Sequence, residues 1–310
     1  MKGIFLQAIP AIRRTYRKFA PDRVVSSYYY LNFLAVLALW NKNIIVCEHG
    51  SFKNFARSRN VRGFKGWIAD IANFIVVQFD RFAGKIVVVS DGLRDELVSY
   101  FKLPAHKIIR IYNPVVTEEL LTAAMAPVDH PWIQYKSSKI ILSVGRLIAH
   151  KDYPTLIHAF KKVRLRIDCK LIMVSDGPER QHLQNLVKSL GLEDSCMLTG
   201  FVENQYAYMS KTDVFVLPST LEGFALVIAE ALACGCQVVS TDCPSGPAEI
   251  LEGGKYGALV PMRDIDAMAN AIYDVLAGHN TIPHEQLTAR ANDFSADKAI
   301  AEYCRILAIP

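Results

Sequence analysis

The chain has 310 residues, enough for two domains of ordinary size, and its 51% hydrophobic and 21% charged residues are typical of a folded globular protein. This composition excludes a disordered chain. Charge is unevenly distributed, because residues 1–130 carry 18 Lys and Arg against 10 Asp and Glu, whereas residues 131–310 carry 17 against 20. The first part of the chain is therefore the basic one.

The N-terminus predicts no secretory signal, because MKGIFLQAIPAIRR has a short apolar region and no small-residue cleavage site after it. The longest apolar run, Tyr28 to Trp40, contains Asn32 and is too short to span a bilayer, so we expect a core helix there. The seven cysteines are odd in number and include no C-x2-C pair, which favours reduced thiols. These features predict a cytoplasmic protein with no metal site.

Short strands and helices alternate in the first part of the chain. We expect helices at 6–19, 28–40, 68–82 and 91–99, and strands at 24–25, 44–47, 86–90 and 108–115. Strand 44–47 runs directly towards His49, and ligands of open parallel sheets lie at such carboxyl ends. His49 is therefore a candidate site residue; the alternative is a histidine that only hydrogen-bonds to local backbone.

A basic and aromatic stretch, residues 52–66, follows His49. It contains Phe52, Lys53, Phe55, Arg57, Arg59, Arg62, Phe64 and Lys65. Nucleic acid is one partner class for such a stretch, but its position after His49 favours a mobile loop beside the candidate site, or a surface for anionic lipid or diphosphate. A solvated basic loop is the third alternative. We expect no nucleic-acid partner.

The second part of the chain repeats strand and helix after a connection expected at 116–138. Strands are expected at 139–144, 171–174, 197–199, 214–217 and 237–241. Helices are expected at 155–165, 224–233, 264–276 and 296–307, and a further helix should end at Leu190. Strand 139–144 opens into Gly145 and Arg146, with Lys151 five residues further on. The Arg guanidinium can donate two parallel hydrogen bonds and the Lys ammonium is a compact positive charge, so the two residues at the carboxyl end of a strand suit phosphate groups.

The stretch 218–235, reading PSTLEGFALVIAEALACG, forms a turn and a helix after strand 214–217. The backbones of Glu222 and Glu230 should lie about 12 Å apart along it. This separation is too long for a glycosidase carboxylate pair and suits the two ends of an elongated ligand. The N–H groups of the intervening turn favour an anion, so a nucleotide-sugar fits. The alternative is that Glu222 only complements the helix dipole and Glu230 is solvated.

The segment EGFALVIAE, residues 222–230, resembles the E-x7-E signature of the family-four retaining glycosyltransferases, and Gly145, Arg146 and Lys151 match their G-R-x4-K diphosphate clamp. The resemblance implies an α/β protein of GT-B fold, with two Rossmann-like domains facing across a cleft. In that family the first Glu contacts the donor sugar and the second the ribose hydroxyls, and Phe201 lies where members hold the base. Catalytic roles are thus expected for Arg146, Lys151, Glu222 and His49. Donor-binding roles are expected for Gly145, Phe201, Val202, Gly223, Phe224, Ala225, Leu226 and Glu230.

The resemblance also implies the domain boundaries. Residues 1–115 would form a shortened acceptor-side domain to which the C-terminal helix 296–310 crosses back, 116–138 the connection, and 139–295 the nucleotide-sugar domain. Members of the family begin with a strand and a Gly-rich loop that have no counterpart here, which leaves about three recognisable strands in the first domain. We expect either a shortened enzyme or a chain that a partner completes.

CPSGPAEI, residues 243–250, resembles a variant common in bacterial transferases that use UDP-hexoses and UDP-acetamido-hexoses. We therefore expect a retaining, metal-independent glycosyltransferase without a cofactor, which uses a UDP-sugar as co-substrate. Its acceptor would be a glycan or a polyprenyl-diphosphate-linked sugar in bacterial surface polysaccharide synthesis, as for lipopolysaccharide or capsule. The rivals are a sugar-nucleotide epimerase of the same fold and a non-catalytic donor-binding or partner subunit. The basic first part favours peripheral binding to the anionic inner face of the cell membrane.

Overall fold

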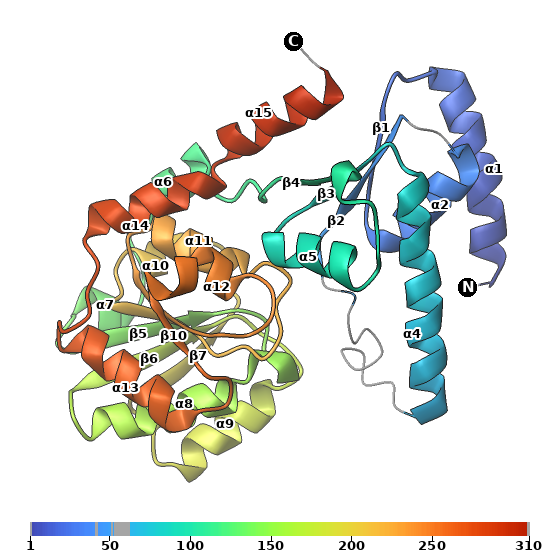
Figure 1. Cartoon of the computed structure of the whole chain (residues 1–310). Helices are drawn as coiled ribbons and strands as arrows, with labels where there is room; N and C mark the ends of the chain where they lie inside the picture. Colours follow the sequence, from blue (N-terminus) through green and yellow to red (C-terminus); the bar gives the residue numbers. More distant parts are fainter. Residues whose placement is uncertain (1, 41–42, 51, 53–62, 309–310) are drawn as a thin grey trace. The chain divides into compact units, whose positions relative to one another are not determined.

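The structure is a computed structural model of the chain, and it describes residues 2–40, 43–50, 52 and 63–308. Residues 53–62 of the basic and aromatic stretch 52–66 lie outside these residues. The chain forms two compact units (Figure 1), one of Met1–Tyr112 with Ala301–Pro310 and one of Asn113–Ile300.

A parallel sheet of four strands in the order β1-β2-β3-β4 forms the centre of the first unit. The strands are β1 (Val24–Ser27), β2 (Ile44–Glu48), β3 (Lys85–Val88) and β4 (Ile108–Arg110). All five residues of β2 are buried, which agrees with its run of β-branched side chains. Each of the four strands expected from the residue pattern is present, so the estimate of about three recognisable strands, which rested on the family resemblance, was one too low.

Helices connect these strands. They are α1 (Lys2–Phe19), α2 (Tyr29–Leu39), α4 (Gly63–Gln78), the 3-10 helix η1 (Phe79–Phe82), α5 (Asp91–Ser99) and the 3-10 helix η2 (Ala105–Lys107). Helix α2 packs on β1 and β2, α5 packs on β3 and β4, and α4 packs on α2 and η1. Helix α5 begins at Asp91 as the sequence predicts, and Ser90 caps it, because the Ser90 Oγ accepts a hydrogen bond of 3.1 Å from the Leu93 N–H.

The second unit contains a parallel sheet of six strands in the order β10-β9-β8-β5-β6-β7. The strands are β5 (Lys139–Val144), β6 (Cys169–Val174), β7 (Cys196–Gly200), β8 (Val214–Leu217), β9 (Gln237–Thr241) and β10 (Ala258–Val260). From β5 the chain builds outward to β7, and it then returns to place β8 on the other side of β5. This reversal opens a crevice at the carboxyl ends of β5 and β8, where ligands of such sheets bind.

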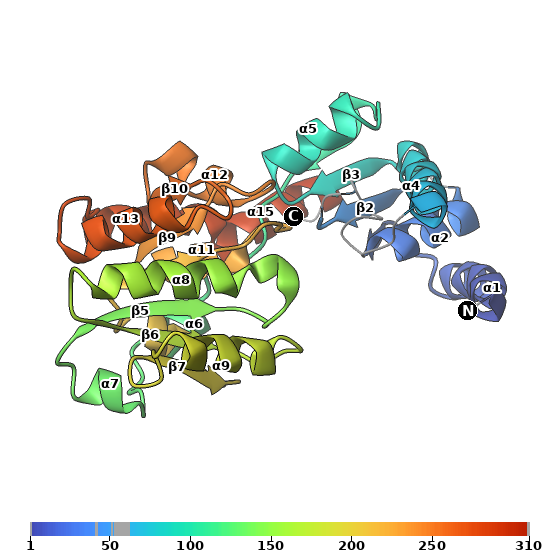
Figure 2. The same cartoon turned by 90° about the horizontal axis from the view of Figure 1, so that it is seen from below.

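Helices cover both faces of the six-stranded sheet (Figures 1 and 2). One face carries α8 (Tyr153–Arg164), α9 (Arg180–Ser189) and α13 (Ile265–Leu276), and the other α10 (Gln205–Met209), α11 (Leu226–Ala233), α12 (Pro247–Ile250) and α14 (His284–Ala291). Short 3-10 helices lie at Ala149–Lys151 (η3), Glu252–Gly254 (η4) and Asn292–Phe294 (η5). Phe160 of α8 and Ile272 of α13 belong to one fully buried cluster with Leu171 of β6, so the apolar periodicity of the sequence faces the sheet as expected.

The segment 116–138 contains two helices, α6 (Glu118–Ala124) and α7 (Pro131–Gln134), and belongs to the second unit. The last helix, α15 (Ala296–Leu307), has its residues from Ala301 onward in the first unit, where the Tyr303 hydroxyl lies 3.6 Å from the Cys47 sulfur. Parallel sheets with connecting helices in both units confirm the prediction of an α/β protein with two Rossmann-like domains. Within the ranges described, each helix is too short or too polar to cross a bilayer.

Candidate active site

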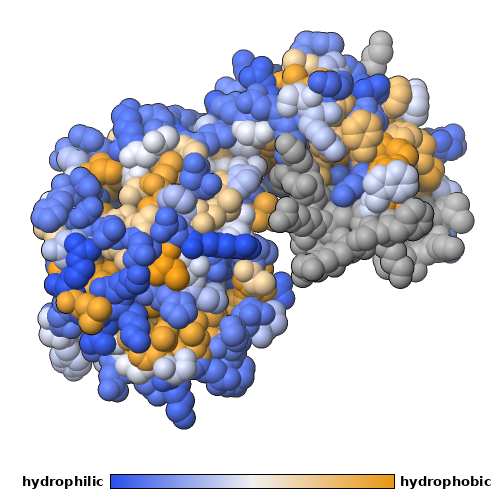
Figure 3. All heavy atoms as spheres, turned by 60° about the horizontal axis from the view of Figure 1, so that its bottom comes forward, coloured by the Kyte–Doolittle hydropathy of each residue, from blue (hydrophilic) through white to orange (hydrophobic). Residues whose placement is uncertain are grey.

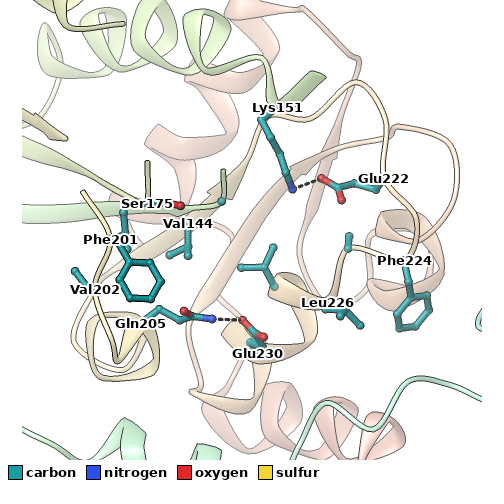
Figure 4. Close-up of a pocket in the computed structure, with 14 residues that line it drawn as sticks. Val144, Lys151, Ser175, Phe201, Val202, Gln205, Glu222, Phe224, Leu226 and Glu230 are labelled. Carbon is teal, nitrogen blue, oxygen red and sulfur yellow. Dashed lines mark hydrogen bonds and ion pairs between the residues drawn. The ribbon is translucent and has the colours of Figure 1, made fainter. Parts of the chain in front are cut away.

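A pocket of about 440 Å3 lies in the second unit, at the carboxyl ends of β5, β6, β7 and β8 (Figure 4). Its position is the crevice that the reversed strand order creates. The pocket is lined by Val144, Gly145, Lys151, Val174, Ser175, Phe201, Val202, Gln205, Glu222, Phe224, Ala225, Leu226, Val227 and Glu230.

One end of the pocket holds an ion pair between Lys151 and Glu222. The Lys151 Nζ lies 2.6 Å from the Glu222 Oε1, and the two side chains are only 14% and 11% exposed. Lys151 ends η3 in the loop after β5, and Glu222 lies in the turn after β8. A backbone hydrogen bond of 2.8 Å from the Thr220 N–H to the His150 carbonyl joins the same two loops. The local folds therefore bring a cation and a carboxylate together in the pocket.

The other end of the pocket holds Glu230, which points inward from α11 (Figure 4). The Gln205 side-chain amide donates a hydrogen bond of 3.1 Å to the Glu230 Oε2. Burial raises the pKa of Glu230, and the hydrogen bond from Gln205 partly opposes this rise. One carboxylate oxygen is thus oriented by α10, and the buried carboxylate is available to accept hydroxyl groups.

The N-terminal end of α11 faces the pocket between the two carboxylates. Helix α11 begins at Leu226, and Ala225 before it has a left-handed backbone with φ 59°. Phe224, Ala225 and Leu226 all line the pocket. The first N–H groups of a helix have no intrahelical acceptor and carry a partial positive charge, so this end of the pocket wall favours an anion.

A tight backbone contact supports this turn from behind. Gly246 has φ 115°, and a Cβ placed on it would lie 2.4 Å from the Phe224 carbonyl oxygen. Phe224 is buried, and its ring packs against that of Phe294 at a centroid distance of 5.7 Å. The glycine of the segment CPSGPAEI is therefore required by the close approach of two loops.

The residues that follow β5 and β6, Gly145 and Ser175, also line the pocket. The Tyr153 hydroxyl donates a hydrogen bond of 2.5 Å to the Gly145 carbonyl, and the Gly145 N–H donates to the Val174 carbonyl at 3.2 Å. Ser175 has φ 124°, unusual for a residue with a side chain, and its N–H donates to the Gly200 carbonyl at 2.9 Å. Strained backbone of this kind is often found at ligand sites.

Most of the residues expected from the sequence line this one pocket. Gly145, Lys151, Phe201, Val202, Glu222, Phe224, Ala225, Leu226 and Glu230 are among its lining residues. Gly223 is half-buried in the same turn, and Arg146 is exposed next to Gly145; neither is among the lining residues. His49 lies in the first unit, exposed, with its Nε2 2.8 Å from the Ser27 Oγ.

The sequence analysis missed Val144, Val174, Ser175, Gln205 and Val227. Ser175 directly follows β6, so the rule that ligands lie at carboxyl ends of strands would have found it. Gln205 gives no such signal, because its partner Glu230 is 25 residues away on another helix. Its position became visible only with the packing of α10 beside α11.

The pocket suits a ligand with an anionic centre and hydroxyl groups at both ends. Lys151 and the start of α11 supply positive charge, and Glu222 and Glu230 supply hydrogen-bond acceptors at either side of it. Phe201, which is 78% exposed, offers an aromatic face near Val202. In the part of the chain that the structure describes, no three His, Cys, Asp or Glu side chains come together as ligands for a metal ion.

Two protein-family models match the chain. "Glycosyl transferases group 1" matches residues 130–293, and "Glycosyltransferase Family 4" matches residues 2–119. The first match contains the whole pocket, and the second contains the four-stranded sheet.

A curated relative from Campylobacter jejuni, N-acetylgalactosamine-N,N'-diacetylbacillosaminyl-diphospho-undecaprenol 4-alpha-N-acetylgalactosaminyltransferase, is 33% identical over 206 residues. The match covers 66% of this chain and 54% of the relative, so the chain spans about half the length of that protein.

Solved structures show the same fold at low sequence identity. A glycosyltransferase from Rickettsia africae aligns with a TM-score of 0.77 and 19% identity, over 99% of this chain and 81% of its own. The Anabaena protein HepE, in complex with UDP, aligns with a TM-score of 0.74 and 19% identity, over 97% of this chain and 81% of its own.

Proposed function

Because the chain belongs to the family-four, group 1 glycosyltransferases of GT-B fold, we propose that it transfers a hexose or acetamido-hexose from a UDP-sugar with retention of configuration. The observation that carries the proposal is the pocket with Lys151 and Glu222 at one end and Glu230 with Gln205 at the other. This arrangement gives an anion site between two groups that accept hydroxyl hydrogen bonds.

The family resemblance assigns the parts of the donor to the parts of the pocket. The diphosphate lies against Lys151 and the start of α11, with Arg146 reaching it from the neighbouring loop. The ribose hydroxyls donate to Glu230, the base stacks near Phe201, and the transferred sugar donates to Glu222. The UDP complex of HepE, which shares the fold, supports a uridine nucleotide as the donor class.

Catalysis in this proposal is electrostatic. Arg146 and Lys151 stabilise the charge that develops on the departing diphosphate, and positive groups preorganised in this way stabilise a transition state strongly. The acceptor hydroxyl attacks the face that the diphosphate leaves, and a donor phosphate oxygen takes its proton. The protein supplies no nucleophile, and His49 from the first unit acts on the acceptor side.

We propose a glycan or a polyprenyl-diphosphate-linked sugar as the acceptor, in bacterial surface polysaccharide synthesis. The name of the Campylobacter relative includes a diphospho-undecaprenol acceptor, and this supports the class. Acceptors of that kind are held in a membrane, so the enzyme would work at its cytoplasmic surface.

Release of UDP from UDP-hexoses and UDP-acetamido-hexoses, measured with and without a polyprenyl-diphosphate-linked sugar, tests the proposal. We expect release that depends on acceptor, with the new linkage in the α configuration by NMR. The variant Glu222→Ala is the matched control, because it should leave nucleotide binding in place and abolish transfer. Donor binding without turnover would support a non-catalytic subunit instead, and acceptor-independent conversion of the sugar would support an epimerase.

A further inference from the structure

Helix α4 of the first unit exposes its apolar side. Five large apolar residues of α4 are 39–62% exposed: Trp67, Ile68, Ile71, Phe74 and Ile75. We call these five residues the α4 stripe. At 3.6 residues per turn they share about one third of the helix circumference, with Ile71 near the centre. A stripe of this width normally faces a protein core.

The opposite side of α4 is the one that packs on the protein, and it is less apolar. Its buried residues are Asn73 and Val77, at 3% and 1% exposure, and Ala69 and Val76 are half-buried. The Asn73 side-chain amide donates a hydrogen bond of 3.1 Å to the Phe52 carbonyl, which fixes the helix in this orientation. Burial of apolar surface alone would favour the orientation in which the α4 stripe faces the protein. The helix adopts the opposite orientation.

Further exposed aromatic residues lie beside the α4 stripe or on other elements of the same unit. The Phe74 and Tyr100 rings lie 6.3 Å apart, and Tyr100 is 51% exposed. Phe82 at the end of η1 is 40% exposed and stacks on Trp40, which is 59% exposed. Figure 3 shows hydrophobic side chains on the visible surface of both units. Tyr and Trp with aliphatic neighbours are typical of surfaces that enter the headgroup region of a bilayer.

The positive net charge of the first unit favours an anionic partner for this surface over a second copy of the unit. Met1–Tyr112 and Ala301–Pro310 carry 19 Lys and Arg against 8 Asp and Glu, a formal net charge of +11. The second unit carries 16 against 22. Two copies of the first unit would repel each other, whereas an anionic surface attracts it. Exposed Arg14, Arg17 and Lys18 on α1 belong to this positive charge.

We propose that the α4 stripe docks the protein on an anionic lipid bilayer, with the apolar side chains among the acyl chains nearest the headgroups and the basic residues of the unit on the anionic headgroups. The proposal deepens the proposed function, because it names the surface by which the enzyme would reach an acceptor held in a membrane. Apolar burial and charge act together, and either one alone gives weak, reversible binding.

Sedimentation of the full chain with vesicles tests this surface. We compare vesicles that contain phosphatidylglycerol with vesicles of phosphatidylcholine alone, at low and high salt. Binding should be strong only to the anionic vesicles and should weaken with salt, because exposed charges are screened within about 8 Å at physiological ionic strength. Each basic residue near the surface should strengthen binding about fivefold.

The double variant Ile71→Asp/Ile75→Asp tests the role of α4. It should bind anionic vesicles at least about tenfold more weakly, a loss of about 1.4 kcal/mol. The matched control is Leu165→Asp, which places a charge on an 84% exposed leucine at the end of α8 in the second unit and should bind as the native chain does. Both variants change exposed side chains, so circular dichroism should show native folding.

A fluorescence measurement gives an independent readout of insertion. The chain has three tryptophans, and Trp40→Phe with Trp132→Phe leaves Trp67 as the single emitter. Its emission should shift to the blue on anionic vesicles and should be quenched by brominated acyl chains.

Equal binding of the native chain and the Ile71→Asp/Ile75→Asp variant, or no binding to either vesicle, would overturn the proposal. A native dimer in light scattering that this variant converts to a monomer, without vesicle binding, would identify a second copy as the partner instead. Turnover with a water-soluble acceptor separates the two proposals. Intact turnover without vesicle binding contradicts only the docking surface, and vesicle binding without turnover contradicts only the proposed function.

Discussion

In the proposed reaction, Glu230 is the residue that best separates nucleotide binding from sugar transfer. Its carboxylate is buried and keeps one oxygen on Gln205. We expect Glu230→Ala to weaken UDP binding by about 1.5–3 kcal/mol, because hydrogen bonds to a charged group have this magnitude. Calorimetric titration with UDP measures the loss. Glu222→Ala provides the contrast, with a UDP affinity that does not fall and with impaired transfer. An unchanged affinity of the Glu230 variant would remove Glu230 from the nucleotide site.

Glu48 predicts a pH dependence of stability in the first unit. The residue is 2% exposed and accepts a hydrogen bond of 2.7 Å from the Asn32 side chain, and Asp80 is buried beside it. Burial raises the pKa of Glu48 to about 7, and burial together with the charge of Glu48 raises the pKa of Asp80. The native state therefore holds a proton that the unfolded chain loses above about pH 4.3.

A group with a raised native pKa stabilises the fold below its unfolded pKa, and this contribution is lost as pH rises through the native value. We thus expect the thermal midpoint of the first unit to fall between about pH 4.5 and 7. The variant Glu48→Gln keeps the acceptor for Asn32 and cannot ionise, so its midpoint should depend less on pH. Parallel pH profiles of the two proteins would contradict the assignment.

At the scale of elements, the turn before α11 depends on the loop behind it. A Cβ on Gly246 would lie 2.4 Å from the Phe224 carbonyl oxygen. This contact is too short, and relieving it would require the backbone at Phe224 to move. We expect Gly246→Ala to displace the turn and to weaken UDP binding at least tenfold, a change of about 1.4 kcal/mol. Calorimetry measures the affinity.

Gly278→Ala is the matched control for that variant. Gly278 also has a positive φ, 81°, but a Cβ there would meet no atom within 4 Å. Gly278→Ala should lower the free energy of unfolding by about 1 kcal/mol, because alanine disfavours this backbone conformation, and it should leave UDP affinity unchanged. A similar affinity loss in both variants would show that strain, and not the contact with Phe224, is responsible.

Some elements around the pocket could be predicted from the sequence. Strand β8 and the start of α11 follow from an apolar run, a turn and a run of small aliphatic residues, and each local signal agrees with the fold. The pairs Lys151 with Glu222 and Gln205 with Glu230 did not follow, because each joins loops or helices far apart in sequence. Local patterns predict which residues end a strand, whereas the strand order decides which ends meet.

Helix α4 shows the other limit of sequence analysis. Periodicity predicts that Ile68, Ile71 and Ile75 share one side of a helix, but it does not tell whether that side meets the protein or the surroundings. The expected helix began at Ile68, whereas α4 begins at Gly63. The polar Asn73 lies inside because its amide finds a backbone carbonyl, a partner that only the structure reveals.

For the whole molecule, the proposed reaction predicts activity in a chelator. In the proposed reaction, Lys151 and the start of α11 in the pocket, together with Arg146 from the neighbouring loop, supply the positive charge that a divalent cation supplies in other transferases. Turnover should therefore persist in EDTA within about twofold. A loss that Mg2+ or Mn2+ restores would show that these groups do not suffice to stabilise the leaving diphosphate.

The ion pair between Lys151 and Glu222 has a consequence for the order of events in a catalytic cycle. A donor that draws Lys151 onto its phosphates takes away the partner of Glu222, and the hydroxyls of the sugar replace it. In the proposed reaction, UDP that has lost its sugar no longer donates hydroxyl groups to Glu222, so Glu222 competes with the phosphates for Lys151. The enzyme would thus discriminate against its own product, because a spent donor leaves a buried carboxylate unsatisfied until UDP departs and the ion pair closes again.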